Sequence, residues 1–265
     1  MTPSAPRDVL ALLLRDPGRP RLTWYGEAPE RIELSGAVLA NWVAKTTNLL
    51  VEELDAAPGT TVVLDLPAHW RALVWALAAW STGATVSLVA ETEPPAPGGA
   101  AGPGPRIVVT HRPASWVRSG PVPATTDLVA VALPGLARSF DGELPAGAID
   151  AAADTMTYED VVGYVPATDA SAPALVDGAA LRVAHAELVP WAREDPAVGP
   201  GARVLLESAV GPAAVLRAAL GTWAADGSVV LLGPHATDRY AAPEARAHLA
   251  ATERLTHDAS RPTLP

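Results

Sequence analysis

Two stretches of the chain repeat one order of hydrophobic and polar positions. In the first, a Pro-Gly pair at 58–59 precedes an apolar run at 61–66, a longer apolar run at 68–82 and a β-branched run at 84–89. Short apolar runs bounded by turn residues are typical of strands buried on both faces, and the longer run is typical of a buried helix. The first stretch therefore predicts a strand, a helix and a second strand.

The same order returns in the second half of the chain. Residues 198–206 form a loop and then an apolar strand, 211–225 an Ala-rich helix and 228–232 a further strand. This twofold internal echo predicts two crossover units, each of which should be right-handed. We therefore expect an α/β fold with two Rossmann-like or flavodoxin-like halves, in which helices flank mainly parallel sheets.

The rest of the chain supplies elements around these two units. The predicted ones are a short helix within 1–20, a hairpin of 21–25 and 31–34, a helix from Gly36 to about Ala56 with Ser35 as its cap, strands at 106–110 and 127–133, a region without regular structure at 134–168, a hairpin or bent strand at 174–176 and 180–183, a helix at 185–193 and a terminal helix at 242–255.

Proline and glycine divide the chain. Residues 91–105 are so rich in both that they cannot join a helix or a sheet, and we expect a linker or surface loop there. Residues 1–90 would then hold the N-terminal helix, the hairpin and the first crossover unit. Residues 106–257 would hold the remainder of the same α/β domain with the second crossover unit, and 258–265 would be a frayed tail.

Composition and charge exclude several partners. The 265 residues carry a net charge of −10, and the 19 basic residues are scattered singly, so neither nucleic acid nor an anionic membrane is an expected partner. The uncharged run at 72–90 is long enough to span a membrane, but the Ser-Thr-Gly at 81–83 breaks it. The chain has no cysteine, which fits a cytoplasmic location without disulfides.

Residues that could carry catalysis are few. None of the six histidines stands at metal-ligand spacing from another, so we predict no metal site. Asp65, His69 and Ser208 could be arranged as a triad, but the chain has no Gly-x-Ser-x-Gly elbow, and His69 is better interpreted as a cap of its helix. Lys45 is the only lysine in the chain and is expected on a solvated helix face.

The sequence of residues 55–89, DAAPGTTVVLDLPAHWRALVWALAAWSTGATVSLV, resembles the N-terminal region of the AMP-forming ligases, which include acyl-CoA synthetases. Residues 34–50 resemble the early helix of that family, and residues 198–233 resemble its second crossover unit. Residues 252–257 resemble the end of its next helix, which leads into a strand that we expect to be absent from this chain. The resemblance extends from about Leu22 to Leu255 and implies the fold of the N-terminal part of such a ligase.

The resemblance also implies a phosphate loop, rich in Ser, Thr and Gly and ending in Pro-Lys-Gly before a strand and a helix. The corresponding place in this chain is Val165–Ala174, which has neither glycine nor lysine and holds Asp169, a side chain that repels phosphate. The glycine-rich run at 98–102 lacks a following helix or lysine. The chain also ends before the family's later nucleotide motifs and its C-terminal lid with the catalytic lysine.

The remaining ligand candidates lie where a crevice at the carboxyl ends of the strands is expected. These crevice positions are Ser208, Gly211, Gly233 and His235. ATP or AMP would be the ligands that the resemblance implies, but without a phosphate loop no cofactor is predicted.

Three functions remain open. The first is a degenerate, non-catalytic relative of the AMP-forming ligases that acts as a binding or regulatory module, a pseudoenzyme. The second is an adenylate-forming ligase that is active only with a partner chain supplying the lid. The third is a scaffold or homodimer that associates through tryptophan-bearing helices. Core packing is the primary interpretation of those tryptophans, which include Trp42, Trp70, Trp75, Trp80 and Trp223.

Overall fold

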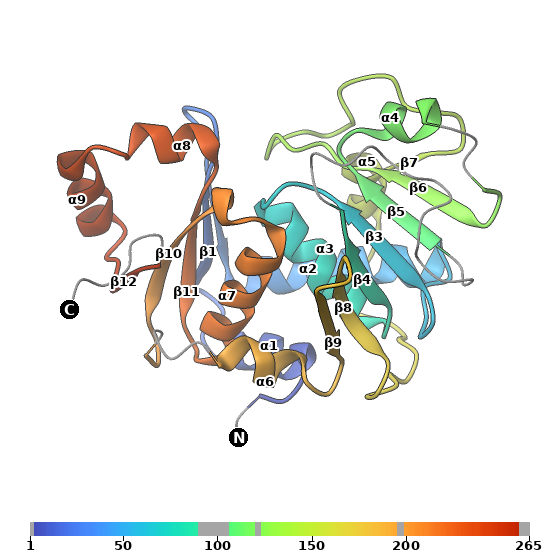
Figure 1. The fold of residues 1–265 in the computed structure, drawn as a ribbon, viewed down its shortest axis with the longest axis horizontal. Helices are drawn as coiled ribbons and strands as arrows, with labels where there is room; N and C mark the ends of the chain where they lie inside the picture. The colour runs from blue at the N-terminus through green and yellow to red at the C-terminus, as the bar shows by residue number, and fades with distance from the viewer. Residues whose placement is uncertain (1–2, 90–105, 120–122, 195–198, 260–265) are drawn as a thin grey trace. The chain divides into compact units, whose positions relative to one another are not determined.

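The computed structural model describes residues 3–89, 106–119, 123–194 and 199–259. The chain separates into two compact units, each built around its own sheet (Figure 1). Unit 1 comprises Met1–Ala40, Ala68–Leu73 and Ala186–Pro265, and unit 2 comprises Asn41–Pro67 and Val74–His185. The predicted linker at 91–105 and nearly all of the predicted tail lie outside the described residues. Among the described residues, no helix has the length and apolar character that crossing a membrane requires.

Unit 1 contains a five-stranded sheet with the order β12-β10-β11-β1-β2. Its strands are β1 (Pro20–Tyr25), β2 (Arg31–Ser35), β10 (Arg203–Glu207), β11 (Ser228–Leu232) and β12 (His257–Asp258). Its helices are α1 (Pro6–Leu13), α6 (Leu188–Arg193), α7 (Pro212–Ala224), α8 (Pro234–Arg239) and α9 (Pro243–Thr252). All neighbours pair in parallel except β1 and β2, which form the predicted antiparallel hairpin.

The predicted second crossover unit is confirmed as β10, α7 and β11. The two strands are parallel neighbours, and α7 packs against both of them. Strand β11 is buried along its whole length, as expected for a strand covered on both faces. On one side of the sheet, apolar side chains of β1, β10 and β11 meet α8 and α9 in one core cluster of buried residues: Tyr25, Leu205, Val230, Leu232, Ala236 and Leu249.

Unit 2 contains a seven-stranded sheet with the order β7-β6-β5-β3-β4-β8-β9. Its strands are β3 (Thr61–Asp65), β4 (Thr85–Leu88), β5 (Arg106–Thr110), β6 (Thr126–Ala130), β7 (Ile149–Asp150), β8 (Pro173–Asp177) and β9 (Leu181–Ala184). Only β8 and β9 pair antiparallel, as the predicted hairpin. The predicted first crossover unit is confirmed. Along the chain α3 (Trp70–Ser81) lies between β3 and β4, and these two strands pair in parallel.

The long helix predicted to begin at Gly36 is present. Helix α2 (Gly36–Glu52) begins after Ser35, whose hydroxyl accepts a hydrogen bond from the Val38 N–H at 3.3 Å, so the predicted cap is confirmed.

Four of the tryptophans named for core packing are buried, and Trp42 is half-buried; the buried ones are Trp70, Trp75, Trp80 and Trp223. The core interpretation is therefore confirmed for these four side chains.

Several short elements depart from the prediction. The region at 134–168 holds β7, the single-turn helix α5 (Ala151–Asp154) and a 3-10 turn (Thr155–Thr157), and the unpredicted helices α4 (Pro113–Arg118) and α8 have six residues each. Elements this short do not complete the two turns that reveal a helical period. The strand expected to be missing after the terminal helix exists as β12, which pairs in parallel with β10.

Candidate functional site

At the carboxyl edge of the five-stranded sheet, the segments that follow β1, β10 and β11 lie next to one another. Tyr25 and Glu207 both pair in register with Leu232, so the residues that follow these three strands lie side by side. Two of the predicted crevice positions, Ser208 and Gly233, are thereby neighbours at one edge of the sheet. In open α/β sheets this edge is where ligands bind.

Gly211 and His235 take up different positions around the same edge. Gly211 has φ +89° and precedes α7, with its N–H bonded to the Ser208 carbonyl at 3.0 Å; a Cβ placed on it would meet no atom within 4 Å. His235 is the second residue of α8 and its side chain is exposed. The Ser208 hydroxyl makes no hydrogen bond to a histidine or carboxylate of the described residues, so it has no activating base there.

An indole covers Gly233. A Cβ on Gly233 would lie 2.7 Å from the Trp24 ring, and the indole N–H donates to the Glu30 carboxylate at 2.9 Å. The Trp24 ring also meets the His69 imidazole edge-on, with ring centroids 4.3 Å apart. Because the Ser208 hydroxyl makes no hydrogen bond to a histidine or carboxylate of the described residues, the possible triad of Asp65, His69 and Ser208 is not assembled as one hydrogen-bonded set.

The start of α3 supplies a buried cation to this unit. His69 Nδ1 accepts the Arg71 N–H at 3.2 Å, which confirms His69 as a cap of its helix. The Arg71 guanidinium lies over the Trp70 ring at 4.4 Å. Burial lowers the pKa of Arg71 to about 10, while the Glu30 carboxylate raises it. The sequence did not identify Trp24, Glu30 and Arg71 as candidate site residues, because the hairpin and the start of α3 come together only in the tertiary fold.

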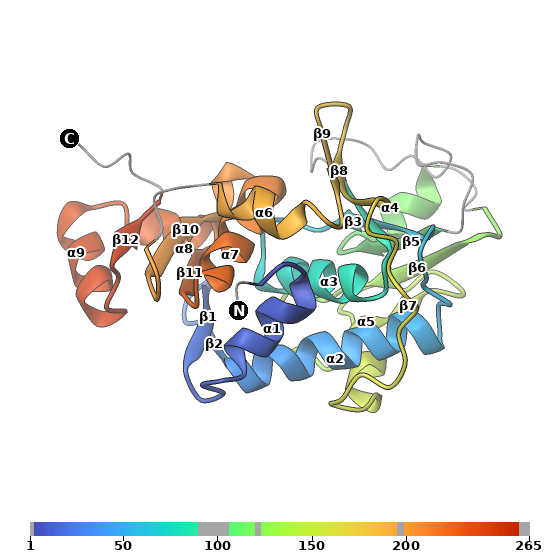
Figure 2. The same cartoon turned by 90° about the horizontal axis from the view of Figure 1, so that it is seen from below.

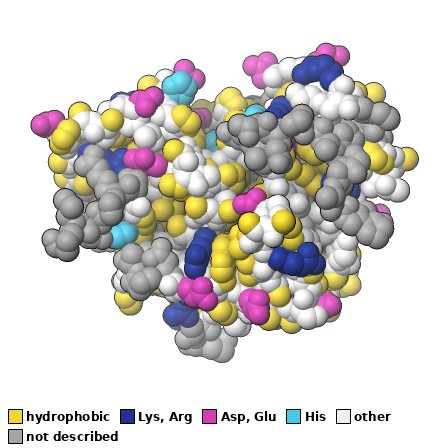
Figure 3. Space-filling view, viewed as in Figure 1, with side chains coloured by type: hydrophobic (Ala, Val, Ile, Leu, Met, Phe, Trp, Pro, Cys, Tyr) yellow, Lys and Arg dark blue, Asp and Glu magenta, His cyan; other side chains and the backbone are white. Residues whose placement is uncertain are grey.

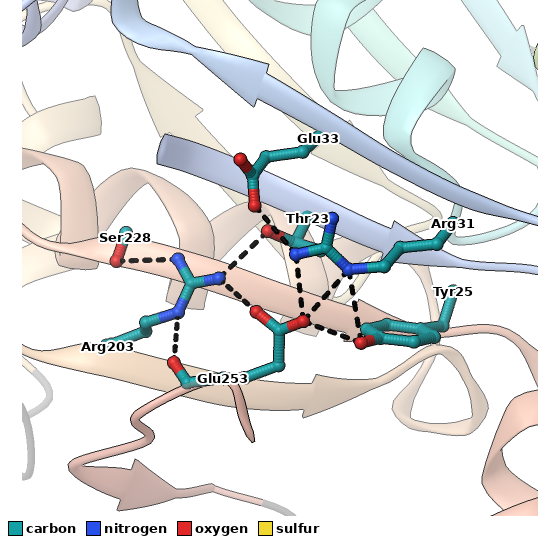
Figure 4. Close-up of polar contacts among 7 residues, drawn as sticks. All are labelled: Thr23, Tyr25, Arg31, Glu33, Arg203, Ser228 and Glu253. Carbon is teal, nitrogen blue, oxygen red and sulfur yellow. Dashed lines mark hydrogen bonds and ion pairs between the residues drawn. The ribbon is translucent and has the colours of Figure 1, made fainter. Parts of the chain in front are cut away.

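A second polar cluster crosses the same sheet. Tyr25 Oη donates to the Glu253 carboxylate at 2.6 Å, and Arg31 reaches the same carboxylate at 2.9 Å (Figure 4). Arg203 binds both the carboxylate and the backbone carbonyl of Glu253. Burial and the bond to Glu253 raise the pKa of Tyr25 to about 12. The phenol is therefore protonated at neutral pH, and the cluster ties β1, β2 and β10 to the end of α9.

Unit 2 has its own carboxyl-edge cluster, centred on Asp65. Strand β3 is followed in sequence by β4 on one side of it and by β5 on the other, so the strand order reverses between β3 and β5. Asp65 ends β3 there, and its carboxylate accepts from Thr110 Oγ1 at 2.7 Å, Arg112 Nη2 at 2.7 Å and Trp116 Nε1 at 2.8 Å. Because these donors already occupy the carboxylate, it serves as a fixed anchor and leaves little capacity for a ligand.

The predicted place of the phosphate loop, 165–174, ends within β8, and a second turn lies outside it at 178–180. Residues 165–172 precede β8, whereas the turn at 178–180 directly precedes strand β9 and helix α6. Asp169 is exposed and accepts from the Ser171 N–H and hydroxyl at 2.9 Å and 2.8 Å, which lowers its pKa. Neither turn contains a lysine. In the part of the chain that the structure describes, no group of His, Cys, Asp or Glu is arranged to hold a metal ion.

Gly233 and Gly211 allow a matched test of the edge. We expect Gly233→Ala to lower the free energy of unfolding by about 1–3 kcal/mol, because the added methyl forces the Trp24 indole aside. We expect Gly211→Ala to cost about 1–3 kcal/mol from backbone strain alone, because φ +89° with ψ 163° is a conformation that essentially only glycine adopts, and to leave the indole in place. Urea unfolding followed by tryptophan fluorescence measures both; an equal cost with unchanged native emission would contradict the proposed contact.

Comparison with known proteins places the fold. The chain superposes on the nonribosomal peptide synthetase FmoA3 with a TM-score of 0.64 and 20% identity, covering 97% of this chain and 25% of that one. It superposes on the acetoacetyl-CoA synthetase of Streptomyces lividans with a TM-score of 0.63 and 19% identity, covering 86% and 38%. It superposes on an amide bond synthetase mutant from Marinactinospora thermotolerans with a TM-score of 0.62 and 19% identity, covering 96% and 48%.

These superpositions confirm the predicted fold class, an α/β fold resembling the N-terminal domain of the AMP-forming ligases. No protein-family model matches the chain. In sequence, 78 residues are 49% identical to the TIGR03089 family protein of Mycobacterium tuberculosis, a match that covers 29% of this chain and 32% of that protein. The chain thus spans less than half of the length of each of these proteins.

Proposed function

We propose that this chain is a non-catalytic binding or regulatory module with the fold of an AMP-forming ligase N-terminal domain. One observation supports this function above others. Lys45, the only lysine in the chain, lies in α2 and donates a hydrogen bond to the Tyr158 carbonyl and forms an ion pair with the Asp160 carboxylate. A phosphate clamp needs glycine amides that approach the oxygens and a cation that neutralises them. The turns at 165–172 and 178–180 lack that lysine, so the ligase scaffold stands without its clamp.

The charges near these turns work against an anionic substrate. Asp169 lies in the first turn, and Asp177 immediately precedes the second. A triphosphate brought to either turn would be repelled by the carboxylate beside it. A cysteine-free chain is compatible with a reducing compartment, and we propose the cytoplasm as the place where the module acts.

An adenylation assay tests this function. We expect the purified chain, given Mg-ATP and a panel of carboxylic acids, to release no pyrophosphate above the rate without protein. A ligase of the same fold, assayed beside it with its own acid, is the positive control. Acid-dependent pyrophosphate release by the chain, abolished by Ser208→Ala, would refute the proposal and assign the edge a catalytic role.

A second candidate is an adenylate-forming ligase that a partner completes with the lid. It is favoured by the carboxyl edge itself, where Ser208 and Gly233 lie side by side and the space beyond Gly211 is open. Calorimetric titration with Mg-ATP, AMP and an acyl-adenylate analogue separates the two. Saturable binding weakened by His235→Ala supports a surviving nucleotide site, and absence of binding leaves the binding module. Because Trp70, Trp75, Trp80 and Trp223 are buried, assembly through tryptophans would rest on the half-buried Trp42.

A further inference from the structure

A buried histidine of unit 2 connects two turns. His185 directly follows β9, the second strand of the β8–β9 hairpin (Figure 2), and its exposed fraction is 6%. One of the turns, residues 82–84, lies between α3 and β4, and the other, residues 165–172, precedes β8. Histidine is the side chain whose charge changes most readily near neutral pH, so its burial between two turns bears on the response of this unit to acid.

The backbone of His185 holds the turn at 165–172. Its N–H donates to the Ala172 carbonyl at 3.0 Å. In the same turn Thr168 lies against Gly83, because a Cβ built on Gly83 would come within 3.4 Å of the Thr168 Cα. Gly83 has φ +78°, a conformation that favours glycine, and the missing side chain lets the backbone of the other turn approach closely. The two turns are therefore in contact.

The imidazole ring of His185 holds the turn at 82–84. The ring is hydrogen-bonded to the backbone of Gly83 and Ala84, where only a carbonyl can accept from it. Nε2 is buried and makes no hydrogen bond to any described residue. The donor is therefore Nδ1, and Nε2 carries the free lone pair of a neutral imidazole. Only in this uncharged form is every N–H of the ring bonded.

A second proton on this ring must bind to Nε2. It would create a buried, charged N–H that no described residue is placed to accept, and such a group costs more than a neutral one in the same place. Burial accordingly lowers the pKa of His185 below the usual 6.5, and the bonds to Gly83 and Ala84 and the charge of Asp169 offset only part of this effect. If the turn opened and water reached Nε2, the ring would take up the proton at its ordinary pKa.

The charged side chains around His185 are exposed. Asp169, in the turn at 165–172, attracts the proton, but its carboxylate lies in solvent and accepts from the Ser171 N–H and hydroxyl. The turn at 82–84 carries no charge. Near His185 in sequence, Arg182 and Glu187 are both exposed, so water and salt screen them. An exposed carboxylate of this kind opposes the effect of burial without cancelling it.

We propose that His185, with the turns at 82–84 and 165–172, forms an acid-sensitive clasp. At neutral pH the uncharged ring and the backbone N–H hold the turns together, and in acid a solvent proton binds to Nε2 and the turn at 165–172 separates. The clasp needs no reactant other than the proton, and it is independent of any nucleotide. Its release would free the end of β9, where the chain passes from unit 2 into unit 1.

Hydrogen exchange tests the clasp, because the protection of an amide measures how often its hydrogen bond opens. The amide of residue 185 is followed by NMR from about pH 7.5 to about pH 5, and each rate is divided by the intrinsic rate at that pH. The pKa is depressed in the closed form, so the stabilisation is complete above 6.5 and is lost as the pH falls from 6.5 toward the closed-form value. Protection should therefore fall by up to about tenfold per pH unit in that range. Amides of β3 should keep their protection, since the opening is local.

Two variants make the test specific. His185→Asn keeps a donor near the position of Nδ1 but cannot take up a proton, so the protection of residue 185 should no longer depend on pH. His248→Asn, at an exposed histidine of α9, is the matched control and should respond to acid as the wild type does.

The ring itself gives a measurement that needs no variant. At neutral pH, nitrogen NMR should find the proton of His185 on Nδ1 and the lone pair on Nε2. A ring protonated on Nε2, unchanged protection of the wild-type amide in acid, or an equal fall in His185→Asn would each overturn the proposal.

Discussion

Replacing Asp65 with alanine should lower the free energy of unfolding by about 3 kcal/mol or more at neutral pH. The carboxylate is 1% exposed, and its loss removes an acceptor that the Arg112 guanidinium, the Thr110 hydroxyl and the Trp116 indole share. Buried donors that lose their acceptor incur the full cost of desolvation. Urea unfolding of unit 2 measures the effect, with Asp160→Ala as the matched control.

The control removes the acid of another ion pair in the same unit. Asp160 pairs with Lys45 but is 56% exposed, so its loss should cost about 0–1 kcal/mol. If the two variants unfold at the same denaturant concentration, Asp65 is not the anchor of the β3–β5 edge.

The stabilisation by Asp65 should depend on pH. Burial raises the pKa of Asp65, but hydrogen bonds from Arg112, Thr110 and Trp116 lower it further, so the net pKa lies below the usual 3.8. A group with a depressed folded-state pKa contributes its stability above its unfolded pKa and loses it as the pH falls through the folded value. The difference between wild type and Asp65→Ala should therefore shrink below about pH 4.

Replacing Glu253 with alanine should be at least as damaging to unit 1, by about 3–5 kcal/mol. The Glu253 side chain is 3% exposed and accepts from Tyr25, Arg31 and Arg203 at once. Its removal leaves Arg203, 14% exposed, without its carboxylate and frees the end of α9 from β10. Chemical unfolding of the wild type and the variant, monitored by total tryptophan fluorescence, gives the difference in free energy.

Glu33→Ala is the matched control for Glu253. Glu33 also pairs with Arg31, but both side chains are more than a third exposed, so a cost of about 0–1 kcal/mol is expected. Burial raises the pKa of Glu253, and the bonds from Tyr25, Arg203 and Arg31 lower it below the usual 4.5. Its contribution should accordingly vanish as the pH falls below about 4. An effect that persists unchanged at pH 3 would contradict the ion-pair explanation.

The basic side chains are divided between the surface and the interior of the two units. On the face drawn in Figure 3, Lys and Arg side chains stand apart from one another among apolar and acidic ones. Several of the arginines instead serve inside the units: Arg21 is 1% exposed and pairs with Asp226, and Arg246 pairs with Glu207 and Asp258. Arginine suits such places because its guanidinium donates in several directions at once.

Local sequence predicts the crossover units because their signals are local. The Pro-Gly turns, the short apolar runs and the longer helical runs each occupy adjacent residues, so both β-α-β units and the β1–β2 and β8–β9 hairpins follow from pattern alone. The same reasoning fails for α4, α5, α8 and β12, which are too short to show a period and form because the surrounding fold holds them. It also misassigned the surroundings of Lys45.

By itself, the sequence determined the α/β class, the order of the two crossover units and the absence of a lysine from 165–174, the segment that the resemblance aligns with a phosphate loop. Only the tertiary structure decided which polar groups meet. Tyr25 and Glu253 are 228 residues apart, and Lys45 and Tyr158 are 113 apart. Turn and helix preferences are properties of neighbouring residues, whereas a buried carboxylate and its donors become partners only when the sheet brings distant strands together.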